Sequence, residues 1–284
     1  MNSVTITKLT QDYLRDADRI LQAAFGSPDS RLEDLRRLTN LQSEGWFLAT
    51  MDGKPVGTVG AMDYGDFAYI GMMAVHPDSQ RKGIATQLMK RILDWVEGRG
   101  CRISLLDATS MGESIYRRFG FIEVDRSQQF TRKNHSMTAY IPPAISELRP
   151  QDIPALKELD LMIFGADRLA VIDAYLVTFP GRGFLVRDEK GEVSGYLLVQ
   201  HRKLGPWVAR TPWEAEALLQ AALTLPYPDG APVALAPAAN SAATSLLERF
   251  GFKADLSLPH MQRGGARHPC QRYLVYGQTS FAIG

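Results

Sequence analysis

Hydrophobic and polar positions along the chain follow two different periods, and each period predicts one kind of element. Apolar residues run almost without a break over residues 69–75, which predicts a buried strand, and Pro77 ends its ladder of hydrogen bonds. Beyond that strand, apolar residues recur at helical spacing, at Ile84, Leu88 and Ile92. The pattern therefore predicts a helix that starts at Gly83, packs its apolar face on a sheet and stops near Gly98.

Two short hairpins are predicted, one in each half of the chain. Residues 46–50 and 55–60 are strand-like runs joined by Asp52-Gly53, a pair that favours a tight turn. The second half carries a similar turn around Glu189-Lys190-Gly191. Hairpins at corresponding places indicate that the two halves follow a similar plan.

The halves also share short sequence pieces. Residues 116–121, Tyr-Arg-Arg-Phe-Gly-Phe, are echoed 131 residues later by Leu-Glu-Arg-Phe-Gly-Phe at 247–252. Other pieces pair in the same order: Gln11-Asp12 with Gln151-Asp152, Phe25-Gly26 with Phe164-Gly165, Phe47-Leu48 with Phe184-Leu185, and Ile70-Gly71 with Leu204-Gly205. A common order with a small drift in spacing is expected of two copies of one unit that differ by loop insertions.

Each copy reads as a strand, one or two helices, a hairpin, another strand, a long helix, a strand, a short helix and a final pair of strands. This order predicts an α/β (α+β layered) fold, with a mixed central sheet flanked by helices in each of two tandem domains. Pro142 and Pro143 oppose both helix and central strand, so the boundary is placed near residue 143. The predicted domains are residues 1–141 and 145–284.

Composition and charge limit the classes of function. A chain of 284 residues that is 45% apolar can bury a large core, and its length agrees with two domains. Its 32 basic and 31 acidic residues leave a net charge of +1, with no long run of one sign. The sequence thus lacks a broad electrostatic footprint for nucleic acid or an anionic membrane, and any anion site must be local.

Targeting and metal-binding signals are absent from the pattern. Residues 1–6 lack the layout of a signal peptide, and no apolar stretch approaches the roughly 20 residues that span a bilayer, so we expect a soluble, cytoplasmic protein. Cys101 and Cys270 are too few for a disulfide framework or a metal-ligand cluster, so we expect free thiols and no metal. His260 and His268 lack a zinc spacing and are expected to be loop residues.

The segment between the predicted strand and helix is suited to an anion. A strand, a loop and a helix N-terminus present backbone N–H groups that have no intrahelical acceptor, and the helix dipole favours negative charge there. Gly83 leaves room for a ligand to approach the backbone, and Arg81 and Lys82 add positive charge. No GxxxxGK[ST] or GxGxxG motif is present in this stretch. The alternative interpretation is an ordinary helix start with a basic first turn.

The same stretch resembles motif A of the GCN5-related N-acetyltransferase (GNAT) superfamily. That motif is a strand ending in V-x-P followed by [QR]-x-x-G-x-[GA], and it is found here as Val75-His76-Pro77 and then residues 80–85, Gln-Arg-Lys-Gly-Ile-Ala. The resemblance implies that this loop holds the pyrophosphate of acetyl-CoA, used as a co-substrate. It further implies that residues 1–141 form the catalytic N-acetyltransferase domain.

Downstream, residues 105–121 resemble the GNAT pattern that ends in L-Y-x-x-x-G-F. Many family members carry Asn seven residues before the Tyr, whereas this chain has Thr109. Its next residues, and the duplication, resemble the subgroup with a second, YitH-type acetyltransferase-like domain. The resemblance implies a set of coenzyme-binding residues: Met73, Ala74, Val75, Gln80, Arg81, Lys82, Gly83, Ile84, Ala85, Thr86, Thr109 and Gly112.

Acyl transfer to an amine requires a neutral amine, stabilisation of the developing oxyanion and a proton for the departing thiolate. The GNAT pattern places Tyr116 near the coenzyme sulfur, where a phenol can donate that proton. Without the motif, Tyr116 would read as an aromatic packing residue. Backbone N–H groups near Met73 and Val75 are candidates for the oxyanion, because GNAT members splay this strand from its neighbour.

The general base is the least determined role, because family members fill it with different residues or with water. Asp107 is the candidate, since it ends the strand that follows Cys101, although such an acid can equally satisfy the next backbone turn. Asp63 and Asp66 flank a turn and are expected to be solvated loop charges.

The second half lacks the elements of the coenzyme site. The corresponding stretch, residues 206–214, has no glycine, and Leu247 stands in the place of Tyr116. Asn240 takes the place of Thr109. We therefore expect residues 145–284 to be a degenerate domain that shapes the acceptor pocket and binds no acetyl-CoA in this manner.

Taken with the resemblance, these patterns predict an acetyl-CoA-dependent N-acetyltransferase that acts on a small-molecule amine, with neither nucleic acid nor membrane as a partner. Two alternatives stay open. One is a non-catalytic acyl-CoA-binding regulatory module, and the other is a protein N-acetyltransferase, which needs an open acceptor groove.

Overall fold

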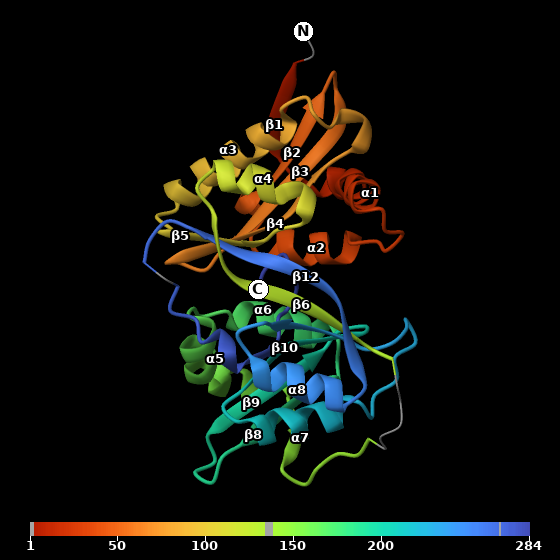
Figure 1. Cartoon of the computed structure of the whole chain (residues 1–284), viewed down its shortest axis with the longest axis vertical. Coiled ribbons are helices and arrows are strands. Elements are labelled where there is room, and N and C mark those ends of the chain that lie inside the picture. The colour runs from red at the N-terminus through yellow and green to blue at the C-terminus, as the bar shows by residue number, and fades with distance from the viewer. Residues whose placement is uncertain (1–2, 134–138, 267) are drawn as a thin grey trace.

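The computed structural model describes residues 3–133, 139–266 and 268–284 and shows two layered units stacked along the long axis (Figure 1). The first repeat holds these elements in order: β1 Val4–Lys8, α1 Leu14–Phe25, α2 Leu32–Leu41, β2 Trp46–Met51, β3 Lys54–Asp63, β4 Phe67–Val75, α3 Ile84–Gly98, β5 Ile103–Asp107, α4 Ser110–Arg118 and β6 Ile122–Arg132. Short 3-10 helices lie at Gln11–Tyr13, Ser43–Gly45 and Pro77–Ser79. The predicted α/β layered class is confirmed.

The second repeat follows a closely similar order: β7 Ile145–Glu147, α5 Lys157–Phe164, α6 Leu169–Thr178, β8 Gly183–Arg187, β9 Val193–Val199, β10 Lys203–Ala209, α7 Pro212–Ala222, β11 Val233–Pro237, α8 Ser241–Arg249, β12 Phe252–Arg263 and β13 Val275–Gly277. Its 3-10 helices are Pro150–Leu156 and Arg272–Leu274. Both predicted hairpins are present, as β2–β3 and β8–β9.

Paired sequence pieces occupy equivalent places in the two repeats. Gly26 ends α1 and Gly165 ends α5, and both adopt the left-handed conformation that glycine tolerates best. Thr109 and Asn240 each accept a hydrogen bond from the first turn of the helix they precede, α4 and α8. The duplication read from the sequence is therefore a duplication of structure.

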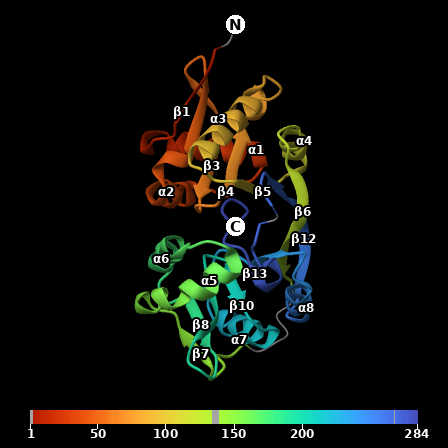
Figure 2. The same cartoon turned by 90° about the vertical axis from the view of Figure 1, so that its left-hand side faces the viewer.

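The two repeats share one sheet of 13 strands, in the order β1-β2-β3-β4-β5-β12-β6-β11-β10-β9-β8-β7, with β13 beside β10. Strand β6, from the first repeat, pairs with β11 of the second, and β12 of the second pairs with β5 of the first. The two long strands also pair with each other and cross from one unit to the other (Figure 2). The repeats have therefore exchanged a strand.

This exchange corrects the expectation that each repeat closes with its own pair of strands. In the first repeat, β6 is the last strand, and residues 139–144 form none. Both neighbours of β6, β11 and β12, come from the second repeat. Their pairing satisfies backbone groups of β6 that would otherwise form open sheet edges. The division at residues 141 and 145 stays a prediction about the sequence repeats.

Helices cover the shared sheet differently on its two sides. Helix α3 packs on the first repeat and α7 on the second, each with its own apolar cluster. A third cluster runs through both repeats, because α1 and α2 of the first face α5 and α6 of the second (Figure 2). Thr39, Leu38 and the other buried residues of α2 thus lie near the boundary of the repeats.

We expect a fragment ending at residue 141 to fail to fold by itself. It would lack β12, and the edge of β5 would lose its partner along with the apolar contacts shared by the repeats. The soluble yield and circular dichroism of fragment 1–141 measure this, with the full chain as control. Co-expression with fragment 145–284 should restore a soluble complex, whereas a folded, monomeric 1–141 would contradict the expectation.

Candidate functional site

The loop between β4 and α3 leaves a helix N-terminus open. Gly83 is the N-cap of α3 and has a φ of +78°, and no side chain caps the helix. Arg81 also has a positive φ, of 62°, so the chain curls before the helix begins. The free N–H groups of the first turn, in a loop with alternating backbone conformations, form a concave site that favours an anion.

Contacts around the loop keep it in place. Gln80 Nε2 donates a hydrogen bond to the carbonyl of Val75, 3.2 Å away, which ties the loop to the end of β4. A Cβ added at Gly83 would meet no atom within 4 Å, so the space in front of this residue is open. Lys82 Nζ, by contrast, donates to the carbonyl of Asp78 at 3.0 Å.

A cavity of about 460 Å³ begins at this helix N-terminus. The structure brings eleven of the twelve predicted coenzyme-binding residues to its wall: Met73, Ala74, Val75, Gln80, Arg81, Gly83, Ile84, Ala85, Thr86, Thr109 and Gly112. Lys82 is the exception. Residues that the sequence reading missed also line the cavity, among them Ala24 and Phe25 at the end of α1 and Met111 and Ile115 on α4.

Strands β4 and β5 separate beside this cavity. Their parallel pairing spans only Phe67–Ile103 to Tyr69–Leu105, although β4 continues to Val75. Met72, in the unpaired part, has a positive φ of 52°, and the pairing of β4 with β3 shifts register nearby. The backbone of β4 on this side is therefore not occupied by a neighbouring strand, as the splay inferred from the resemblance requires.

Tyr116 lies against the same cavity from α4 and is 7% exposed. Burial raises the pKa of its phenol to about 12, so the hydroxyl stays protonated at neutral pH. Gly112, one turn earlier, makes room for the ring, because a Cβ there would lie 2.8 Å from the ring and 3.1 Å from the hydroxyl oxygen. Thr109 positions this turn by accepting a hydrogen bond from the Gly112 N–H at 3.3 Å.

The equivalent position of the second repeat is closed by its own side chains. Thr211 caps α7, and the Glu214 carboxylate accepts hydrogen bonds from the Thr211 N–H, at 2.8 Å, and hydroxyl, at 2.9 Å. Glu214 is 7% exposed, so a carboxylate fills the place where an anion would approach the helix. Leu247, in the place of Tyr116, is fully buried in the apolar cluster. Over the described residues of this copy, the chain's own side chains occupy the start of the helix.

Asp63 and Asp66 form ion pairs with arginines at the turn between β3 and β4, at the opposite end of β4 from the coenzyme cavity. Asp66 is exposed and forms an ion pair with Arg102 at 2.8 Å. Asp63 is only 10% exposed in its side chain and accepts a hydrogen bond from Arg99 Nε at 2.8 Å. Although burial opposes it, this bond lowers the pKa of Asp63. Asp63 is thus less exposed than a solvated loop charge.

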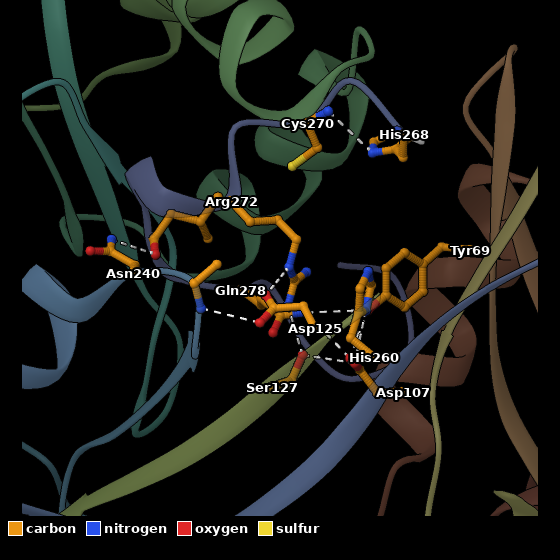
Figure 3. A network of polar contacts seen from close by, with 12 residues as sticks. Tyr69, Asp107, Asp125, Ser127, Asn240, His260, His268, Cys270, Arg272 and Gln278 are labelled. Atoms are coloured by element: carbon orange, nitrogen blue, oxygen red, sulfur yellow. Dashed lines mark hydrogen bonds and ion pairs between the residues drawn. The ribbon is translucent and has the colours of Figure 1, made fainter. Parts of the chain in front are cut away.

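Asp107, the predicted base, is buried at the centre of a polar network (Figure 3). Its carboxylate accepts hydrogen bonds from Tyr69 Oη at 2.6 Å, Ser127 Oγ at 2.7 Å and Gln278 Nε2 at 3.3 Å. His260 Nδ1 lies 3.0 Å from the same group. Burial would raise the pKa of Asp107, but its bond to His260 and the positive charge of Arg272 hold the pKa below its usual value.

His260 corrects another expectation, because it is no loop residue. It lies in β12 opposite Asp107 of β5 and is 2% exposed. No local signal could have found this contact, because the two residues stand 153 positions apart and meet only through the exchanged strand. His268 and Cys270 do lie in a loop, where the Cys270 N–H donates to His268 Nδ1 at 3.3 Å.

Neither metal sites nor membrane helices were found in the described part of the chain. Within residues 3–133, 139–266 and 268–284, no cluster of three or more His, Cys, Asp or Glu side chains is arranged to hold a metal ion. Over the same residues, every helix is too short or too polar to cross a bilayer. Cys101 and Cys270 are free thiols.

Comparison with known families assigns both repeats. Residues 10–121 match the acetyltransferase (GNAT) family, and residues 156–277 match an acetyltransferase (GNAT) domain. The two matches cover most of the chain and fall on either side of the predicted boundary. The narrower YitH-type assignment of the second half stays a prediction.

Individual relatives agree with this result. The holothin acyltransferase of Pseudoalteromonas sp. (strain SANK 73390) is 24% identical over 253 residues, which cover 86% of this chain and 84% of that one. A crystal structure of a Pyrococcus horikoshii protein with a provisional acetyltransferase assignment is 27% identical, with a TM-score of 0.87 over 99% of this chain and 96% of that one. A GCN5-related N-acetyltransferase from Sphaerobacter thermophilus shares the fold at 17% identity, with a TM-score of 0.68 over 94% and 98% of the two chains.

Proposed function

This chain belongs to the GNAT acetyltransferase family as two tandem domains, and on that premise we propose that its first repeat transfers an acetyl group from acetyl-CoA to a small-molecule amine. One observation carries the proposal. A single cavity joins an open helix N-terminus, the unpaired part of β4 and the phenol of Tyr116. These are an anion site, a set of backbone donors and a proton donor, the three parts that thioester chemistry requires.

In the proposed complex, the pyrophosphate of acetyl-CoA lies at the N-terminus of α3, close to Gly83 and Arg81. The pantetheine arm follows the gap between β4 and β5, and backbone N–H groups near Met73 and Val75 bind the thioester oxygen. Supporting this arrangement, the cavity reaches from residues 80–81 and 83–86 to Met73 and Tyr116 without leaving the first repeat. Donors held in place before the reaction stabilise the oxyanion without reorganisation.

The reaction itself moves two protons. The neutral amine attacks the thioester carbon, the new C–N bond forms, and the C–S bond breaks. Tyr116 gives its proton to the departing thiolate, and the proton that the nitrogen loses as the amide forms restores the phenol through solvent. Because burial raises the pKa of Tyr116 to about 12, the phenol carries its proton at neutral pH when the thiolate departs.

A small acceptor is supported by the arrangement of the second repeat. Phe164 of α5 packs against Tyr69 on one face of the first repeat, and β12 extends the same sheet beside Asp107, so the second repeat covers part of this face. A relative that covers most of both chains is named for acyl transfer to holothin, and we extend a non-protein acceptor to this chain by analogy. N-alpha-acetyltransferase 30 of Schizosaccharomyces pombe, at 27% identity, matches only 49% of this chain.

Incubation of the protein with acetyl-CoA and a library of amines, with free thiol measured over time, tests the proposal. Thiol release that requires both an amine and the protein is the expected result. Tight acetyl-CoA binding with no release for any amine would support the non-catalytic module in its place. Turnover with peptide N-termini and with no small amine would support the protein acetyltransferase.

A further inference from the structure

A second cavity, of about 520 Å³, lies at the seam between the repeats, and we call it the seam pocket. Strands β5, β6 and β12 and the segment 268–273 form its walls, with Leu105, Val124, Asp125, His260, Arg272 and Tyr273 among its lining residues. The transfer chemistry proposed above uses none of the polar groups on these walls. Figure 3 shows them gathered between the repeats, with the Arg272 side chain directed toward the cluster of Asp107 and His260.

The hydrogen bonds of His260 determine which of its ring nitrogens is basic. Nδ1 lies 3.0 Å from Asp107 Oδ1, and an ionised carboxylate can only accept, so the proton of the neutral ring is on Nδ1. Nε2 then carries the lone pair. Over the described residues, no hydrogen bond involves Nε2, and His260 lines the seam pocket. The result is a carboxylate–imidazole pair whose basic nitrogen is free for a ligand.

The charged groups that face His260 come from three elements. Asp107 on β5 and Asp125 on β6 are each negative, and Arg272 on the covering segment, paired with Asp125 at 2.6 Å, is positive. Burial and Arg272 lower the pKa of His260, and burial lowers that of His268 to about 4, so both rings are neutral at pH 7. Tyr69 on β4 is neutral as well, because burial raises its pKa. The cluster has a net charge of −1.

Leu105 lines the seam pocket and is the β5 residue of the last pair between β4 and β5. Tyr69 is the last residue of β4 paired with β5, and its ring centroid lies 5.9 Å from that of His260. Asp107 ends β5 two residues before Thr109, which lines the coenzyme cavity. Leu105 and Asp107 point to one face of the sheet, and Leu106 packs under α3 on the other. His260 is thus on the opposite face of the sheet from Tyr116, with its ring beside Tyr69, the last β4 residue before the gap.

We propose that the seam pocket binds the acceptor amine and that His260 Nε2 accepts the proton which its ammonium group must lose before attack. Asp107 is the positioning residue of this pair, so the predicted base acts through a histidine of the second repeat. The inference rests on the proposed function. The acceptor class that fits is a primary amine, charged in solution, with an apolar or aromatic body that can lie against Leu105, Val124 and Tyr273.

The proton balance is complete with groups already named. One proton passes from the ammonium nitrogen to His260 Nε2, and the imidazolium is stabilised by the Asp107 carboxylate. The free lone pair attacks the thioester carbon as described above. His260 then returns its proton to solvent, so that each turnover yields an amide, a thiol and one released proton.

A purely structural role for the network is the competing interpretation, because it also joins β4, β5, β6 and β12. The His260→Gln variant separates the two. At pH 7, kcat/KM for the amine should fall about 100-fold, a usual contribution of a general base, and should recover above the pKa of the free amine. The Kd for acetyl-CoA should be unchanged. His201→Gln is the matched control, since His201 is exposed on the second repeat and pairs with Asp229.

Wild-type enzyme supplies the corresponding pH profile. His260 must be neutral to accept a proton, and its pKa is lowered, so kcat/KM for the amine should decline only as the pH falls below the ordinary histidine range. This limb should disappear in His260→Gln. An equal loss of activity at every pH, together with a lower Tm, would assign His260 a structural role and overturn the proposal.

A second variant tests the pocket without changing the network, in case His260→Gln fails to fold. Ala239 is exposed and lines the pocket. It contacts Asp125 through its backbone N–H and not through its side chain, so Ala239→Trp adds bulk at the entrance and keeps this hydrogen bond. KM for the amine should rise at least tenfold with the Kd for acetyl-CoA unchanged. Ala238→Trp, at the exposed neighbour that does not line the pocket, is the control. An unaltered KM in Ala239→Trp would place the acceptor elsewhere.

Failure of this inference differs from failure of the proposed function. If the wild-type chain releases no thiol with any amine, the proposed function fails first. If the wild-type chain turns over, and both His260→Gln and Ala239→Trp leave its kinetics with the amine unchanged, only the inference about the seam pocket is rejected.

Discussion

Replacement of Gly83 by glutamate is expected to weaken acetyl-CoA binding by about 100-fold, or ~2.7 kcal/mol. Two effects combine. Gly83 has a φ of +78°, where an L-residue is strained by about 1 kcal/mol, and the added carboxylate would project from the open N-terminus of α3. A negative charge there takes the place that the pyrophosphate needs and repels it. Glu214 shows the same arrangement in the second repeat, where a carboxylate already fills the helix start.

Isothermal titration with acetyl-CoA measures this change. Gly53→Glu is the matched control, since Gly53 has a φ of +75°, a Cβ added there would meet no atom within 4 Å, and the residue lies in the β2–β3 turn away from the cavity. The control carries the same strain and the same charge. Because it lies away from the cavity, it should bind acetyl-CoA normally. Equal Kd values for Gly83→Glu and wild type would remove the α3 N-terminus as the pyrophosphate site.

Replacement of Tyr116 by phenylalanine is expected to lower kcat about 100-fold while the Kd for acetyl-CoA stays the same, because only the proton donor is lost. The ring still fills the space beside Gly112, so the fold should be unaffected. Since burial raises the pKa of Tyr116 to about 12, its hydroxyl is protonated from pH 6 to 10. Wild-type kcat should therefore show no alkaline decline from this group over that range.

Single-turnover kinetics with a saturating amine measure the chemical step in this variant. Tyr175→Phe is the control: Tyr175 is also buried, with its pKa raised by burial, but it lies on α6 of the second repeat. It should retain full kcat. An unchanged chemical step in Tyr116→Phe would mean that the thiolate leaves without the phenol's proton.

Parts of the site that are formed by residues close together in the sequence could be predicted from it. The loop at Gln80–Ala85, the helix after Gly83 and the placement of Tyr116 seven residues after Thr109 each depend on short stretches of chain. The structure brings almost all of them to one cavity. Lys82 shows the limit of this reading, since it shares the motif but turns back to the Asp78 carbonyl.

The repeat was also readable, because two copies of one plan retain the same order of hydrophobic runs, turns and short matching pieces. The sequence did not indicate which strand would pair with each edge strand. Backbone hydrogen bonds are the same for every strand, so β6 and β12 satisfy the edges of the sheet equally well in either repeat, and local sequence carries no signal for the exchange.

The sequence by itself thus determined the fold class, the two repeats and the loop that suits a pyrophosphate, because periodicity and backbone conformation act over a few residues. Only the tertiary structure decided that the repeats share one sheet, and with it that Asp107 meets His260 across 153 positions of chain. The physical reason is that a buried carboxylate requires partners, and which partners reach it depends on strand order. Strand β12 of the second repeat pairs with β5 of the first, and this pairing places His260 at the seam.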